Sequence, residues 1–323
     1  LLMFIPEGIG HYTSKAAMSW LGLGRKNIIE VKTTKKFTID RKDLIQKIEN
    51  TAGIPFVIIA YAGDSRTMAI DDFKGLSKIS KKYGAWLHVD ACHGASLCFS
   101  EKLRKKLKGI ELADSITLDP HKVLFTPYPL SYVLIKEPEK LKVISGVSDL
   151  ITKEAYSFGQ ITPFLGSRSF NSLKLWFLMK HLGKKKIGRL IEKRHEMAKY
   201  FASLIKKSED LYLMNEVMIN SAVYLYVPKK LKKKLEKDSE ETVKLINELN
   251  LKIQKRMFKE GLFYVHTFKL RDFKNVLKAG RDKEYQMQRL MLGNPLTSKK
   301  DLRALIAYTK KISKEEVDKL NGR

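Results

Sequence analysis

The sequence predicts an α/β fold, with a mostly parallel sheet flanked by helices. Two short apolar runs typical of buried strands, residues 85–89 and 115–118, each end abruptly on polar residues. The first run is followed by Asp90, and the second by an Asp-Pro-His-Lys segment that ends at Lys122. Strand-like and helical segments alternate through the first half of the chain, which favours parallel strands joined by right-handed crossovers. In such a sheet, ligands bind at the carboxyl ends of the strands.

The elements that precede this edge are predicted in order from their apolar runs and end signals. An apolar opening run predicts a strand at 1–5, and residues 10–17 lead into a helix that closes at the glycines of 22–24. A strand at 27–31 and a helix at 40–50 follow. A strand at 55–61 and a helix at 72–83 complete the approach to Asp90.

The second half of the chain changes in character. A Thr-Pro-Tyr-Pro turn precedes a predicted strand at 131–135, and the polar, irregular stretch 145–166 is typical of an active-site loop. A helix follows and ends near Gly183, beyond which the composition is helical and rich in lysine. We therefore predict a large domain over 1–182 and a smaller α+β domain over 183–323. The predicted elements of the smaller domain are helices at 187–207, 239–258 and 300–312 and strands at 221–227 and 263–268.

Composition limits the possible classes of protein. Lysine and arginine total 62 against 35 acidic residues, a net charge of +27, but the excess is spread along the chain without interleaved aromatic residues. Solvated lysine-rich faces are therefore favoured over nucleic-acid binding. No apolar run is long enough to span a bilayer and no signal segment opens the chain. Two cysteines, Cys92 and Cys98, form neither a disulfide framework nor a zinc set, so we expect a cytoplasmic protein without a metal.

An amine and a carboxylate at neighbouring strand ends suit a site for pyridoxal 5'-phosphate (PLP). Lys122 would bind the aldehyde of the cofactor, and Asp90 would keep its pyridine nitrogen protonated so that the ring can take up electrons. The alternative interpretation makes Asp90 a helix cap and Lys122 a solvated surface lysine.

The His-Val-Asp-Ala segment around Asp90, with Lys122 of Asp-Pro-His-Lys 32 residues later, resembles the group II PLP-dependent amino-acid decarboxylases. That family includes glutamate, cysteine-sulfinate, aromatic and tyrosine decarboxylases, and the likeness runs from about His11 to about Asn294. The resemblance implies the PLP-dependent transferase fold of type I and a homodimer with its active site at the interface. It also implies decarboxylation of an L-amino acid to its amine and carbon dioxide.

The resemblance assigns cofactor contacts to individual residues. His11 would stack on the cofactor ring, and Cys92 would pack on the opposite face, where the family usually has alanine. Ser65 would reach the phenolic oxygen and His121 the phosphate, while Asp119 stands where some members carry asparagine. For His11, the alternative is a residue that only caps the start of its helix.

The resemblance also assigns three residues to the substrate. Tyr156 would return a proton to the substrate carbon, or else be a packing residue. Arg168 would orient the loop or an anionic group, and Arg289 would bind the α-carboxylate, with a surface ion pair as the alternative for each. The side chain of the substrate stays open. The later half resembles decarboxylases of acidic amino acids, and the turn at 126–129 resembles the tyrosine branch.

One departure from the family is that nothing in the sequence supplies its Gly/Ser/Thr-rich phosphate turn. That turn would precede Leu1, so we expect the N-terminal part to be missing. Three rival functions remain open. They are another PLP-dependent lyase or aminotransferase on the same fold, a truncated non-catalytic partner subunit, and a basic nucleic-acid-binding protein.

Overall fold

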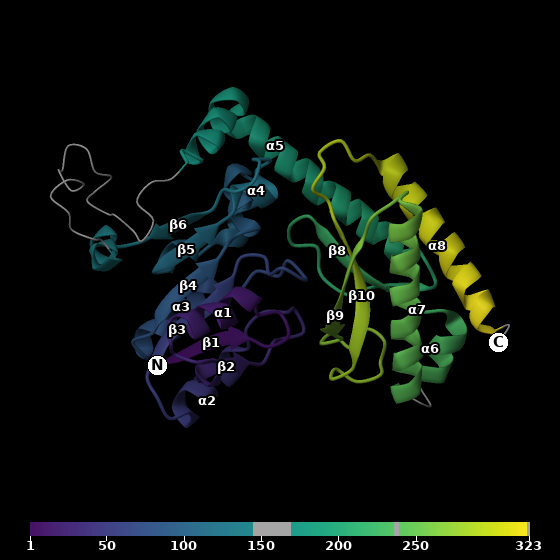
Figure 1. Cartoon of the computed structure of the whole chain (residues 1–323), viewed down its shortest axis with the longest axis horizontal. Helices are drawn as coiled ribbons and strands as arrows, with labels where there is room; N and C mark the ends of the chain where they lie inside the picture. The colour runs from purple at the N-terminus through teal and green to yellow at the C-terminus, as the bar shows by residue number, and fades with distance from the viewer. Residues whose placement is uncertain (145–168, 236–238, 322–323) are drawn as a thin grey trace.

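Two sheets make up the framework of the protein (Figure 1). The computed structural model describes residues 1–144, 169–235 and 239–321. Helix α5 (Ser172–Lys206) runs from the six-stranded sheet to the four-stranded sheet and links them. Over the described ranges, no helix is both long enough and apolar enough to cross a membrane.

The first sheet has six strands in the order β2-β1-β3-β4-β5-β6. Neighbours from β2 to β5 pair in parallel, and only the edge strand β6 runs antiparallel. The mostly parallel sheet confirms the predicted α/β fold. The strands are β1 (Leu2–Pro6), β2 (Ile28–Val31), β3 (Pro55–Tyr61), β4 (Trp86–Asp90), β5 (Ser115–Leu118) and β6 (Tyr132–Ile135).

Helices and short 3₁₀ segments connect these strands. The helices are α1 (Tyr12–Trp20), α2 (Arg41–Asn50), α3 (Phe73–Lys82) and α4 (Pro120–Val123). The 3₁₀ segments are η1 (Arg25–Asn27), η2 (Gly94–Phe99), η3 (Arg104–Leu107), η4 (Ile110–Leu112) and η5 (Pro138–Ile144). Two aspartates set helix starts, because Asp40 accepts from the backbone N–H of Lys42 and Asp72 from that of Gly75.

The second sheet is antiparallel, with the order β7-β8-β10-β9. Its elements are β7 (Leu211–Leu213), β8 (Ser221–Tyr226), α6 (Lys229–Leu235), α7 (Ser239–Glu260), β9 (His266–Arg271), β10 (Glu284–Met291) and α8 (Lys299–Asn321). The sequence misplaced β9 by three residues, because this edge strand carries exposed polar side chains and is not marked by an apolar run. The prediction for α8 was too short, and β7 and α6 were not predicted.

Strand β8 contacts both halves of the molecule. Tyr224 on one face packs in a cluster with residues of α5, α7 and α8. Val223 and Leu225 on the other face pack in a cluster that includes Ile9 and Phe37 from the region of the first sheet. The face of the second sheet that carries Val223 therefore lies against the six-stranded part.

Helix α5 is interrupted at Gly183, whose backbone (φ 68°, ψ 159°) is not helical. The interruption lies where the sequence suggested a boundary between the domains 1–182 and 183–323. That division itself stays a prediction.

Candidate active site

Six of the residues predicted for the site line a single cavity of about 670 Å³ at the carboxyl edge of the first sheet. They come from the N-cap of α1, from the end of β4 and the turn after it, and from the segment that follows β5. They are His11, Asp90, Cys92, Asp119, His121 and Lys122. Parallel pairing places the ends of β4 and β5 side by side, with Asp90 opposite Thr117 in the register. The topology thus brings together residues that are far apart in the sequence.

Lys122 is held by Asp119 at the start of the short helix α4. Its Nζ lies 2.7 Å from Asp119 Oδ2. Burial disfavours the lysine charge, but the hydrogen bond to Asp119 and the charges of Asp119 and Asp90 outweigh it, so the pKa of Lys122 is raised. The pKa of Asp119 is lowered, because hydrogen bonds from Lys122, Ser131 and Cys92 overcome its burial. The amine is therefore kept charged by its partner.

Asp90 is the last residue of β4, and its side chain shares the cavity with Lys122. Its Oδ1 accepts a hydrogen bond from the backbone N–H of Cys92 at 3.0 Å. The charges of Asp90 and Lys122 interact across the cavity. A carboxylate and an amine thus face the same space.

His11 has two roles in the structure. Its Nδ1 lies 2.7 Å from the Thr13 hydroxyl and accepts from the Thr13 backbone N–H, so the residue caps α1. Its ring also lines the cavity, and its own backbone N–H donates to the Tyr61 hydroxyl at 2.8 Å. Burial lowers the pKa of His11, against an opposing effect of the Asp90 charge. A neutral flat ring at the cavity wall is the result.

Cys92 lies in the wall between Asp90 and β5, with its Sγ 3.9 Å from the Thr117 hydroxyl. Burial, followed by the charge of Asp90, raises the pKa of Cys92 well above its usual value, so the thiol stays protonated. Within the described ranges, no three His, Cys, Asp or Glu side chains are grouped as a metal site requires.

His121 is fixed by the chain that follows it. Its Nδ1 lies within hydrogen-bond distance of the backbone oxygen (2.5 Å) and nitrogen (3.1 Å) of Leu130. Its Nε2 lies 3.8 Å from Asp119, and its ring contacts that of Tyr128 with centroids 4.1 Å apart. The imidazole is therefore held in one orientation beside the lysine.

Sequence reasoning missed His88, which also lines the cavity. Its Nδ1 lies 2.7 Å from the Ser115 hydroxyl, and burial lowers its pKa despite the nearby Asp90 charge. The alternation of β4 contains a signal for it, because His88 and Asp90 share one face while Leu87 and Val89 are fully buried on the other.

Sequence reasoning also missed Arg194 of α5, which lies behind the lysine segment. The guanidinium donates to the backbone oxygen of Val123 at 2.8 Å and to that of Gly293, and it stacks over Phe125 at 3.7 Å. Its position repeats the apolar stripe of Ile187, Ile191 and Ala198. An arginine at a core position of a helix is unusual, and this could have marked Arg194 in the sequence as a buried residue with specific partners.

Ser65 and Arg289 contact each other. Arg289 lies on β10 with only 9% of its surface exposed, and its Nη1 donates to the backbone oxygen of Ser65. Neither residue is among the described residues that line the cavity. Their assignments to the cofactor and the substrate carboxylate therefore stay predictions. Tyr156 and Arg168 lie outside the described residues.

Comparisons with known proteins place the sequence in a family. A sequence model described as the pyridoxal-dependent decarboxylase conserved domain matches residues 5–227. Aspartate 1-decarboxylase of Aliivibrio fischeri is 30% identical over 97% of this chain and 57% of its own length. Human cysteine sulfinic acid decarboxylase is 28% identical over 78% of this chain and 52% of its own length.

Solved structures show the same fold. The crystal structure of mouse CSAD superposes with a TM-score of 0.85 at 24% identity, over 97% of this chain and 64% of the mouse chain. Catharanthus roseus tryptophan decarboxylase, in complex with L-tryptophan, gives a TM-score of 0.80 at 22% identity, over 97% of this chain and 62% of its own. The chain thus spans between half and two thirds of the length of these relatives.

Proposed function

Because this chain belongs to the pyridoxal-dependent decarboxylase family, we propose that it contributes the catalytic site for PLP-dependent decarboxylation of an L-amino acid. The products would be the corresponding amine and carbon dioxide. The observation that carries the proposal is the shared cavity of Lys122, Asp90 and His11. An amine, a carboxylate and a flat ring in one cavity are the groups that a pyridine aldehyde requires.

The donor set fits PLP. When bound, the cofactor supplies an electron-poor ring that accepts the electron pair left at the substrate carbon after carbon dioxide departs. Lys122 would hold the cofactor through its amine, and Asp90 would hold a proton on the ring nitrogen. Cys92 would pack against the ring, and its raised pKa suits this role because a protonated thiol adds no negative charge beside the ring.

The residues around Lys122 control its proton. The Asp119 carboxylate, 2.7 Å from Nζ, accepts a hydrogen bond from the charged amine and must release it when the amine reacts. His121 stands 3.8 Å from the same carboxylate and would contact the phosphate of the cofactor. Asp119 is therefore the group that sets how readily Lys122 becomes a nucleophile.

The remaining roles extend the proposal to the substrate. Arg289 would bind the α-carboxylate, Arg168 would orient an anionic group, and Tyr156 would return a proton to the α-carbon. We further propose a cytoplasmic homodimer with the site at the subunit interface. An acidic amino acid is the favoured substrate, because the aspartate 1-decarboxylase of A. fischeri matches 97% of this chain. An aromatic amino acid is the alternative.

The test uses the whole chain, incubated with PLP and a panel of acidic and aromatic amino acids. We expect an absorbance band of protein-bound cofactor and release of carbon dioxide without formation of a keto acid. Lys122→Ala should abolish the band, whereas the matched substitution of the exposed Lys78, Lys78→Ala, should leave it unchanged. A Lys122→Ala protein that retains the band would refute the assignment. Keto-acid production would point to the aminotransferase alternative.

A further inference from the structure

A second cavity, of about 540 Å³, gathers five basic side chains and shares no residue with the candidate active site. We call this cavity the basic pocket. Its basic residues are Lys106, His195, Lys199, Lys206 and Lys274.

The basic pocket is built from segments far apart in the sequence. His195, Lys199 and Lys206 project from one face of α5, because their spacing of four and seven residues matches whole helical turns. Lys106 comes from η3 beside the first sheet, and Lys274 follows β9 of the second sheet. The pocket therefore lies where the two halves of the molecule meet.

Negative charge in the basic pocket is scarce. Glu216 is the one carboxylate among its described lining residues, and it faces four lysines. Across the described part of the chain, Lys199, Lys206 and Lys274 have no carboxylate within 4.0 Å. Lys106 donates to the backbone oxygen of Met218 at 2.8 Å, which leaves it further hydrogen-bonding capacity.

The lysines oppose one another electrostatically. Burial lowers the pKa of Lys106, and the Lys199 charge lowers it further against a raising effect of Glu216. Burial likewise lowers the pKa of Lys274, with Glu216 and Asp272 raising it and Lys206 and Lys36 lowering it. Two half-buried amines thus depend largely on Glu216 for counter-charge, while burial and a neighbouring lysine act against the charge of each.

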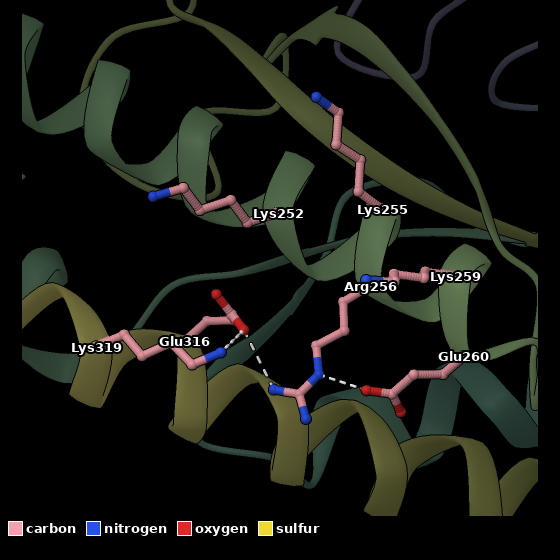
Figure 2. Close-up of a pocket in the computed structure, with 7 residues that line it drawn as sticks. All are labelled: Lys252, Lys255, Arg256, Lys259, Glu260, Glu316 and Lys319. Carbon is pink, nitrogen blue, oxygen red and sulfur yellow. Dashed lines mark hydrogen bonds and ion pairs between the residues drawn. The ribbon is translucent and has the colours of Figure 1, made fainter.

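A larger cavity, of about 760 Å³ between α7 and α8, provides a contrast (Figure 2). Its central cation, Arg256, is already neutralised, with Nε 2.6 Å from Glu260 and Nη2 2.6 Å from Glu315. Its Nη1 lies 3.2 Å from Glu316, which also binds Lys319 at 2.8 Å. Figure 2 shows Lys252 and Lys255 extending from α7 without such partners. Basic residues are as numerous here, but two of them, Arg256 and Lys319, are paired with carboxylates.

We propose that the basic pocket binds a small polyphosphate anion with at least three negative charges. Lysine ammonium groups are effective phosphate ligands, and four of them converge here against one carboxylate. The volume lies in the range of small-molecule sites. No Phe, Trp or Tyr side chain is among the described lining residues, so the contacts that the pocket offers are mainly those of its lysines. A bound anion would link α5 to both halves of the molecule and stabilise the whole chain.

Tripolyphosphate is the probe for this site, with binding measured by calorimetry and thermal unfolding at fixed ionic strength. We expect saturable binding, a raised Tm, and much weaker binding of inorganic phosphate. The double variant Lys199→Gln/Lys206→Gln should weaken tripolyphosphate binding roughly tenfold or more, since two charged contacts are lost. Both lysines are exposed on a helix and glutamine is a good helix former, so the variant should fold.

The matched control is Lys252→Gln/Lys255→Gln, which removes the same charge from the α7 groove and should leave the affinity unchanged. Equal weakening by both double variants would show a general effect of net charge and overturn the proposal. Unchanged binding by Lys199→Gln/Lys206→Gln would place the anion elsewhere, for example at Lys122, and would also overturn it. A short RNA oligonucleotide that binds in place of tripolyphosphate, with the same sensitivity to Lys199 and Lys206, would make the pocket part of a nucleic-acid surface instead.

Discussion

The amine of Lys122 and the carboxylate of Asp119 form an ion pair of 2.7 Å at the start of α4, one helical turn apart. This pair raises the pKa of Lys122 despite its burial. A neutral amine is the nucleophile toward an aldehyde, so the pair slows the reaction of Lys122 with PLP at neutral pH.

Asp119→Asn should therefore accelerate cofactor binding near pH 7, by up to about tenfold for each unit by which the pKa of Lys122 falls. Stopped-flow absorbance as a function of pH measures this effect, and the midpoint of the profile should move to lower pH. Glu137→Gln is a matched control, because Glu137 pairs with the exposed Lys140 at the same spacing and 3.2 Å. If the pH profile of the binding rate were unchanged in Asp119→Asn, Asp119 would not determine the pKa of Lys122.

Arg194 fixes the segment that follows Lys122 to the loop after β10. Arg194→Ala removes two hydrogen bonds to backbone oxygens and the stacking on Phe125, so we expect the free energy of unfolding to fall by about 2–4 kcal/mol. Arg194→Lys keeps the charge and should recover part of this loss. Urea denaturation measures the stability of both variants.

A second measurement tests whether Arg194 also positions the segment that carries Lys122. The affinity for PLP, measured at a temperature where both variants are folded, should be weaker in Arg194→Ala and partly restored in Arg194→Lys. Arg303→Ala, which breaks an exposed contact with Tyr200, should change stability by less than about 0.5 kcal/mol and leave the affinity intact. If Arg194→Ala lost stability but kept its affinity for PLP, Arg194 would stabilise the fold without positioning the site.

Asp71 predicts a specific pH dependence of stability. Its carboxylate is buried and accepts from the backbone N–H groups of Tyr61 and Ile39 at 2.7 Å each. Burial raises its pKa from 3.8 to about 7, outweighing those hydrogen bonds. The unfolded chain thus ionises at lower pH than the folded one, so the contribution of Asp71 to stability is full below about pH 4 and is lost as the pH rises to about 7.

Asp71→Asn should remove this slope. The difference in the free energy of unfolding between wild type and variant should shrink as the pH rises from 4 to 7, by roughly 1.4 kcal/mol for each unit of pKa shift. Chemical denaturation at several pH values provides the comparison. Parallel pH profiles for the two proteins would mean that Asp71 ionises normally in the folded state.

The two cysteines differ in their relation to the cavity. Cys92 lines it, and Cys98 is exposed in η2, while burial raises the pKa of both thiols. We expect iodoacetamide at pH 8 to modify Cys98 faster than Cys92, as followed by mass spectrometry of the peptides. Added PLP should protect Cys92 and leave Cys98 unchanged. Equal protection of both thiols would indicate a global change and not occupation of the cavity.

The sequence predicted the first sheet well because its inner strands are short, largely apolar runs, and β4 and β5 are followed or ended by polar residues. Asp90 and Lys122 could be placed at one edge because parallel pairing fixes that geometry. His88 and Arg194 escaped prediction because the first sits inside an apolar run and the second at a core position of a long helix. The course of β9 could not be predicted, because its pairing with β10 outweighs the preferences of its own side chains.

The contact made by Arg289 could not be predicted from the sequence. Arg289 can be identified from the resemblance as a ligand of a carboxylate, yet its guanidinium donates to the backbone of Ser65. The hydrogen-bond partner of Arg289 depends on how the two halves of the chain pack against each other. That relationship involves residues more than two hundred positions apart and leaves no local pattern.

The interruption of α5 at Gly183 has a stereochemical consequence. A β-carbon built there meets no atom within 4 Å, so space does not exclude a side chain, but the backbone angles suit glycine and not an L-amino acid. Alanine of either hand would restrict the unfolded chain, but D-alanine introduced by chemical ligation would suit the positive φ, whereas L-alanine would be strained there. The chirality of one residue, and not its size, therefore decides whether the two segments of this helix keep their bend.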